Sequence, residues 1–170
     1  MKKLSVIVLA VMSVLVMASC RGPKGDPGNA NVGSSTVKVV SRDWYWDNNT
    51  SWRVDIDYGA INANIDDYGA VLVYMSVGNT WRQLPMTFYY TATDSSGNTL
   101  YCSSSLEVST YRNGVSIFWT ENDFYDGNRP EEHYFKIVVI AASYYNARPD
   151  VDYSDYEAVK RAFQIKEDEK

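Results

Sequence analysis

The stretch that decides the fold is Trp52-Arg53-Val54-Asp55-Ile56-Asp57-Tyr58, in which apolar and charged residues alternate one by one. Successive side chains of a β-strand point to opposite faces, so this pattern places the apolar residues on one face and the charged residues on the other. A strand of this kind needs a sheet around it and a second layer over its apolar face. The stretch therefore predicts a β-protein with one buried and one solvent-facing side to this sheet.

Working outward, six further segments have strand character and are separated by turn residues. The segment 70–77 is apolar on both faces, which predicts a central strand, and Pro85 is expected at an edge or bulge because proline cannot donate to a strand ladder. The segments 81–93, 99–109 and 115–121 are expected to form a meander. The seven predicted strands are 36–46, 52–58, 70–77, 81–93, 99–109, 115–121 and 133–142, and together they predict an antiparallel β-sandwich.

One helix is predicted near the end of the chain, over residues 155–164. Ser154 and Glu157 have the spacing of a capping box, in which the two side chains bind free amides of the first helical turn. Tyr156, Val159 and Phe163 then recur at helical spacing. We expect this helix to lay one apolar stripe on the sandwich.

The N-terminus has the pattern of an export signal. Lys2 and Lys3 precede an apolar run from Leu4 to Val16, which is shorter than the ~20 residues that span a membrane as a helix. Met17-Ala18-Ser19-Cys20 follows and resembles a bacterial lipobox, in which the cysteine is acylated and becomes the new N-terminus. Residues 1–19 are therefore predicted to be a lipoprotein signal peptide and Cys20 a membrane-lipid anchor.

Residues 20–35 are predicted to be a tether and residues 36–170 the folded domain. Three Gly-X-Y triplets run from Gly22 to Ala30, the local pattern of collagen, but three are too few to hold a triple helix. We therefore interpret them as an extended Gly- and Pro-rich linker that lifts the domain off the lipid surface. With Cys20 acylated, Cys102 has no partner for an intramolecular disulfide bond.

The order of these segments resembles a family of Bacteroidetes lipoproteins with a lipobox cysteine, a few collagen-like triplets and a small β-rich domain. The matching stretches include Ala30-Asn31-Val32, Gly69 to Tyr74, Trp81 with Leu84-Pro85, Tyr134 to Ile140, and Val151 to Lys160. The resemblance implies a lipid-anchored envelope protein, most simply of the outer membrane, and supplies no catalytic residue. The acidic run that follows the cysteine in surface-exported members is absent from Arg21 to Lys24.

Composition disfavours several classes of activity. The chain has 16 Lys and Arg against 21 Asp and Glu, and this acidic balance disfavours a nucleic-acid partner. His133 is the only histidine and is expected on the surface at a strand start, while Cys102 is expected to be a small buried residue. Acidic loops could bind calcium, although no EF-hand spacing is present. We expect no enzyme activity, cofactor or metal site. The acidic loops are Asp66-Asp67, Asp123 with Asp126, and Asp150, Asp152 and Asp155.

Aromatic residues are the remaining candidates for a binding site. Trp44, Tyr45 and Trp46 are consecutive, so at least one of them points out of a sheet, and Tyr89-Tyr90 and Tyr144-Tyr145 pose the same question. Sandwich cores also use many aromatic residues. The sequence therefore predicts a binding or structural module with an envelope protein as partner. The alternative is a carbohydrate-binding module, with Trp44, Trp46, Trp52 and Trp81 as candidate ligand-binding residues.

Overall fold

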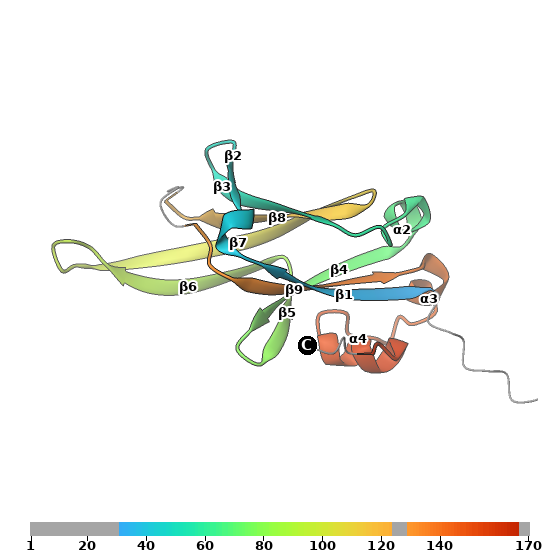
Figure 1. Ribbon diagram of the computed structural model, residues 1–170. Coiled ribbons are helices and arrows are strands. Elements are labelled where there is room, and N and C mark those ends of the chain that lie inside the picture. Colours follow the sequence, from blue (N-terminus) through green and yellow to red (C-terminus); the bar gives the residue numbers. More distant parts are fainter. Residues whose placement is uncertain (1–30, 124–128, 167–170) are drawn as a thin grey trace, which may run out of the picture.

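The computed structural model describes residues 31–123 and 129–166, which form two packed antiparallel sheets and a helical layer (Figure 1). This architecture confirms the predicted β-sandwich. The signal peptide, Cys20 and the collagen-like triplets lie outside the described residues. The strands are β1 (Val32–Val39), β2 (Tyr45–Asp47), β3 (Ser51–Asp57), β4 (Ala70–Val77), β5 (Thr80–Gln83), β6 (Met86–Thr93), β7 (Thr99–Tyr111), β8 (Gly114–Glu121) and β9 (His133–Ile140).

The four-stranded sheet has the order β1-β9-β4-β5, and both of its faces are covered. Val73 and Met75 of β4 belong to the core between the two sheets, while Leu72 and Tyr74 belong to a second core beneath the helix α4 (Tyr156–Phe163). This explains the apolar residues on both faces of 70–77. The prediction of a central strand is confirmed, because β4 lies between β9 and β5.

The five-stranded sheet has the order β2-β3-β8-β7-β6, and the described elements cover only one of its faces. Trp52, Val54 and Ile56 of β3 are buried in the core between the sheets, as their alternation with charged residues predicts. Arg53 and Asp55 lie on the outer face. Strands β6, β7 and β8 form the expected meander.

The predicted strand 36–46 is three elements, and the folded domain begins earlier than expected. β1 starts at Val32, opposite Ile140 of β9, so residues 32–35 belong to a sheet and not to the tether. A short 3-10 turn, Ser41–Asp43, then leads to β2. Residues 32–35 have no alternation of apolar and polar residues that would predict a strand. Gly33 is favoured there by close packing, because a Cβ at this position would lie 2.9 Å from Val139 Cγ2.

The predicted strand 81–93 is divided between the two sheets. β5 pairs with β4 in the four-stranded sheet, whereas β6 pairs with β7 in the five-stranded sheet. The chain crosses between them at Leu84-Pro85, where the peptide bond is cis. The edge position expected near Pro85 is confirmed, because β5 and β6 are each the last strand of their sheet.

The C-terminal helix is α4, and its apolar stripe is confirmed by the burial of Tyr156, Val159 and Phe163. Its cap differs from the prediction: the Asp155 side chain, not that of Ser154, accepts from the amide of Glu157. Two short helices, α2 (Ala63–Tyr68) and α3 (Ala142–Asn146), were not predicted. In residues 31–123 and 129–166, no helix combines the length and apolar character needed to cross a bilayer.

Candidate functional site

Two of the four candidate tryptophans are part of the core. Trp44 is 1% exposed and packs edge-on against Trp119 and Phe135, with ring centroids 6.1 and 6.2 Å apart. Trp52 is 5% exposed on the inner face of β3. Neither ring is accessible to a sugar, so the prediction of a platform containing them is wrong. The cause is the 3-10 turn after β1, which directs Trp44 into the space between the sheets.

The other two tryptophans are partly buried and lie on different sheets. Trp46 of β2 packs against Trp52 at 5.3 Å, while Trp81 of β5 packs against Tyr156 of α4 at 5.9 Å. The fold therefore does not bring the four residues onto one surface.

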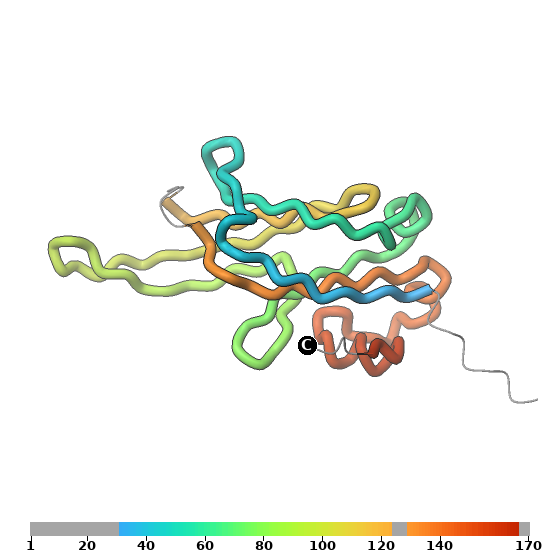
Figure 2. Tube along the Cα trace, viewed as in Figure 1, coloured from blue at the N-terminus to red at the C-terminus, as the bar shows by residue number. Residues whose placement is uncertain are grey.

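The most exposed aromatic side chains of the sheets lie on the hairpin of residues 86–105, called the arm below. In Figure 2 the arm extends beyond the other described elements. Tyr89 and Tyr101 are 83% and 84% exposed. Tyr89 is opposite Ser103 and Tyr101 is opposite Thr91, so the two tyrosines are diagonal neighbours on one face. This face carries hydroxyl-bearing residues and no charge in its strands.

A buried carboxylate holds the other face of the arm to the body of the protein. Glu121 of β8 accepts hydrogen bonds from Tyr90 Oη and Ser104 Oγ, both at 2.7 Å, and from Trp119 Nε1 at 2.6 Å. The bond to Glu121, together with burial, raises the pKa of Tyr90 to about 12. Tyr90 therefore remains a neutral hydrogen-bond donor throughout the physiological range.

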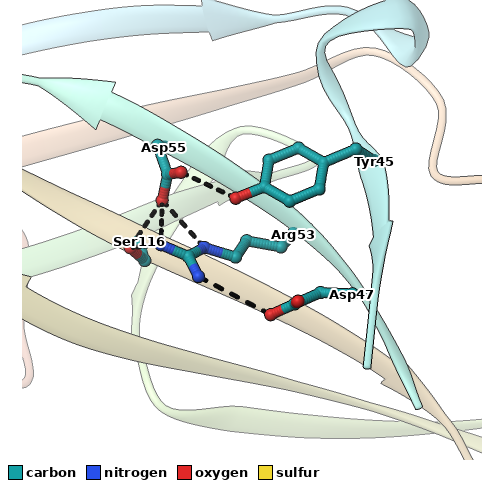
Figure 3. Close-up of polar contacts among 5 residues, drawn as sticks. All are labelled: Tyr45, Asp47, Arg53, Asp55 and Ser116. Carbon is teal, nitrogen blue, oxygen red and sulfur yellow. Dashed lines mark hydrogen bonds and ion pairs between the residues drawn. The ribbon is translucent and has the colours of Figure 1, made fainter. Parts of the chain in front are cut away.

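A polar cluster occupies the outer face of the five-stranded sheet, where β2, β3 and β8 lie side by side (Figure 3). Asp55 accepts hydrogen bonds from Tyr45 Oη at 2.7 Å, Ser116 Oγ at 2.6 Å and Arg53 Nε at 2.9 Å. Asp47 lies 3.6 Å from the Arg53 guanidinium. Arg53 and Asp55, two of the three charged residues predicted to face solvent on 52–58, thus belong to one ordered group.

The electrostatics of this cluster hold its groups in fixed protonation states. Burial alone would raise the pKa of Asp55, but hydrogen bonds from Ser116, Tyr45 and Arg53 outweigh it and place the pKa below its usual range. Burial and the bond to Asp55 raise the pKa of Tyr45 to about 12. At neutral pH the cluster offers a carboxylate, a guanidinium and a half-exposed phenol ring, which suits polar recognition better than proton transfer.

His133 and Cys102 differ from their predicted settings. His133 stacks on Trp119 with ring centroids 5.0 Å apart, and burial lowers its pKa, so it belongs to the rim of the core and not to the open surface. Cys102 is a free, half-buried thiol opposite Tyr90 on the arm.

The acidic loops near the C-terminus stabilise local structure. Asp150 pairs with Arg148 at 3.3 Å, Asp152 accepts from the hydroxyl of Ser154 at 2.6 Å, and Asp155 caps α4. Asp126 lies outside the described residues. Among residues 31–123 and 129–166, no three His, Cys, Asp or Glu side chains are grouped to hold a metal ion.

Sequence reasoning did not single out the arm, although it noted Tyr89-Tyr90. In Met86–Thr93 the apolar residues Met86, Phe88 and Ala92 alternate with hydroxyl-bearing residues, which indicates a strand with one covered face. This pattern does not show that the hairpin extends beyond the other elements, because that depends on how far the second sheet covers it. Comparison of the chain with protein-family models, curated proteins and solved structures found no match.

Proposed function

We propose that this protein is a lipid-anchored interaction module of the bacterial envelope, without enzyme activity, which contacts a partner protein through the arm. The single observation that carries the proposal is the exposure of Tyr89 and Tyr101, 83% and 84%, side by side on a projecting hairpin. The lipobox at Cys20 supports attachment to membrane lipid, most simply in the outer membrane.

The chemistry of the arm is that of a protein-binding surface. Tyrosine supplies a large rigid ring with a polar tip, and neighbouring serine and threonine hydroxyls adapt to the hydrogen bonds of the partner. Thr87, Thr91, Ser103 and Ser105 surround the two tyrosines in register. Because Glu121 binds Tyr90 and Ser104 at the base of the arm, the surface is presented by an ordered hairpin.

The anchor predicts a defined result for Cys20→Ser in the full-length chain. The variant is expected to lose all metabolic labelling by radioactive palmitate and to leave the membrane fraction, because several acyl chains on one cysteine supply ~0.8 kcal/mol for each buried methylene. Cys102→Ser is the matched control and should be labelled as the wild type is. Labelling of the Cys20→Ser protein would contradict the lipobox assignment.

The arm predicts site-specific photo-crosslinking in intact cells. A photoreactive phenylalanine at position 89 should give a discrete crosslinked product, whereas the same group at position 68 should give none. Tyr68 is a matched control because its side chain is 73% exposed but lies on α2, away from the arm. Tyr101→Ala should reduce the product at position 89 by about thirtyfold if this ring contributes the ~2 kcal/mol of a central interface residue. Equal products at positions 89 and 68 would refute the proposal.

Carbohydrate binding is the second candidate function, and the polar cluster of Figure 3 favours it. Tyr45 offers an accessible ring beside Arg53 and Asp55, which is the combination of stacking surface and charged hydrogen-bonding groups that binds sugars. A glycan array discriminates the two functions. Sugar binding that Tyr45→Ala removes and Tyr68→Ala preserves would favour the carbohydrate function, and silence across the array would exclude these sugars as ligands.

A further inference from the structure

β6 differs from the other three edge strands of the two sheets. An open strand edge can pair with another chain, and proteins commonly protect edges with charges or by keeping them short. β2 has three residues and contains Asp47, β5 has four residues and contains Arg82, and β1 contains Lys38. β6 has eight residues, Met86–Thr93, and none is charged. Within the described chain, β6 is the edge that lacks these protections.

The hydrogen bonds of β7 show which backbone groups of β6 face the open side. The amide of Ser103 donates to Asn122 Oδ1 at 3.3 Å, and its carbonyl accepts from the amide of Asn122 at 3.0 Å. Ser103 therefore directs its backbone away from β6, and its direct partner Tyr89 directs its own away from β7. By alternation, the amides and carbonyls of Thr87, Tyr89, Thr91 and Thr93 point to the open edge.

We propose that the partner at this edge is a second copy of the chain, whose β6 pairs antiparallel with the first about a two-fold axis at Tyr90. This inference rests on the proposed function, since both place the contact on the arm. A two-fold axis perpendicular to the sheet keeps each side chain on its own face and sets Tyr90 opposite Tyr90 of the second copy. Tyr89 then lies opposite Thr91, and Thr87 lies opposite Thr93.

This register uses every outward backbone group of β6. Each of the four outward residues is matched with another outward residue, so both copies satisfy the amides and carbonyls that are open in the single chain. The side-chain pairs are aromatic with β-branched and threonine with threonine, which are favourable neighbours across antiparallel strands. The result is one continuous sheet formed from the five-stranded sheets of both copies.

Charge favours a second copy at this edge. The chain has a formal net charge of −5, so two copies repel each other where their charged surfaces meet. The strand segments 86–93 and 99–105 of the arm contain no charged residue. Self-pairing through β6 therefore brings together the part of the molecule where like charges are absent.

The mass of the full-length acylated protein in detergent, measured by sedimentation equilibrium, tests the pairing. The wild type is expected at twice the protomer mass, corrected for bound detergent. Thr91→Pro removes an outward amide that β7 does not use and should give the protomer mass, whereas Thr91→Val keeps that amide and should remain a dimer. A wild type of protomer mass, or a dimeric Thr91→Pro variant, would overturn the proposal.

Cysteine crosslinking tests the register even where Thr91→Pro disturbs the arm. In a Cys102→Ser background, Tyr90→Cys should form an intermolecular disulfide under mild oxidation, because residues facing each other at a non-hydrogen-bonded position have Cα atoms about 4.5 Å apart. Thr87→Cys, whose counterpart in the second copy is displaced along the strand, should not. Absence of the Tyr90→Cys dimer, or equal dimer from both variants, rejects this pairing. If position 89 then crosslinks to a different protein, the self-pairing is rejected while the proposed function of the arm as a protein-binding site is kept.

Discussion

Trp44→Ala is expected to lower the free energy of unfolding by about 3–5 kcal/mol, as for other large aromatic residues removed from a core. Trp44 is 1% exposed and contacts Trp119 and Phe135 edge-on, so alanine leaves a cavity between the two sheets. Urea denaturation of the purified protein, followed by circular dichroism, measures the loss. The result separates the structural role of Trp44 from its predicted role in ligand binding.

Tyr89→Ala is the matched control for Trp44→Ala. Tyr89 is 83% exposed, and surface substitutions of this kind usually change stability by less than about 0.5 kcal/mol. The two variants should therefore have opposite profiles: Trp44→Ala loses stability, and Tyr89→Ala loses partner binding at almost unchanged stability. A Trp44→Ala protein within about 1 kcal/mol of the wild type would contradict the observed core.

Tyr156→Ala is expected to cost about 3–5 kcal/mol and to release α4 from the four-stranded sheet. Tyr156 is 1% exposed, packs against Tyr74 and Trp81 with centroids 5.3 and 5.9 Å apart, and accepts a hydrogen bond from Lys136 Nζ at 3.0 Å. Lys136 is itself 1% exposed, with its ammonium 5.1 Å from the centre of the Trp81 ring. The substitution removes both the ring and one acceptor of a buried cation.

Tyr156→Phe divides this cost into two parts. It keeps the ring against Tyr74 and Trp81 but removes the hydroxyl, and a hydrogen bond to a charged group contributes about 1.5–3 kcal/mol. We expect Tyr156→Phe to keep α4 docked, as judged by hydrogen exchange of the helix amides, at a smaller loss of stability than Tyr156→Ala. Equal losses for the two variants would mean that the ring contributes nothing, contrary to its burial.

Several parts of the fold could be predicted from the sequence because local pattern reports burial directly. The alternation in 52–58 identified the one-sided strand β3, and the continuous apolar run in 70–77 identified β4, covered on both faces. The spacing of Tyr156, Val159 and Phe163 identified the buried stripe of α4. In each case the local spacing of apolar residues shows which faces of the strand or helix are covered.

Other parts could not be predicted because long-range packing decides them. The segment 81–93 reads as one strand, and only the positions of the two sheets show that it crosses between them after Gln83. Residues 32–35 contain no apolar period that would predict a strand. They belong to β1 because they pair with β9 and because Gly33 allows close contact with it. Asp155 caps the helix in place of Ser154, whose hydroxyl donates to Asp152 Oδ1 in the preceding loop.

The candidate sites also divide into features that the sequence determines and features that depend on long-range packing. The sequence by itself determined an acidic composition and an aromatic-rich β-domain, and it predicts a signal peptide and lipobox ending at Cys20, because these properties depend on residue type and near neighbours. Only the tertiary structure decided which aromatic rings are accessible, because exposure depends on what a second sheet covers. The four-stranded sheet helps to bury Trp44 and Trp52. Tyr89 and Tyr101 remain exposed on the arm, where the hairpin of β6 and β7 extends beyond the four-stranded sheet.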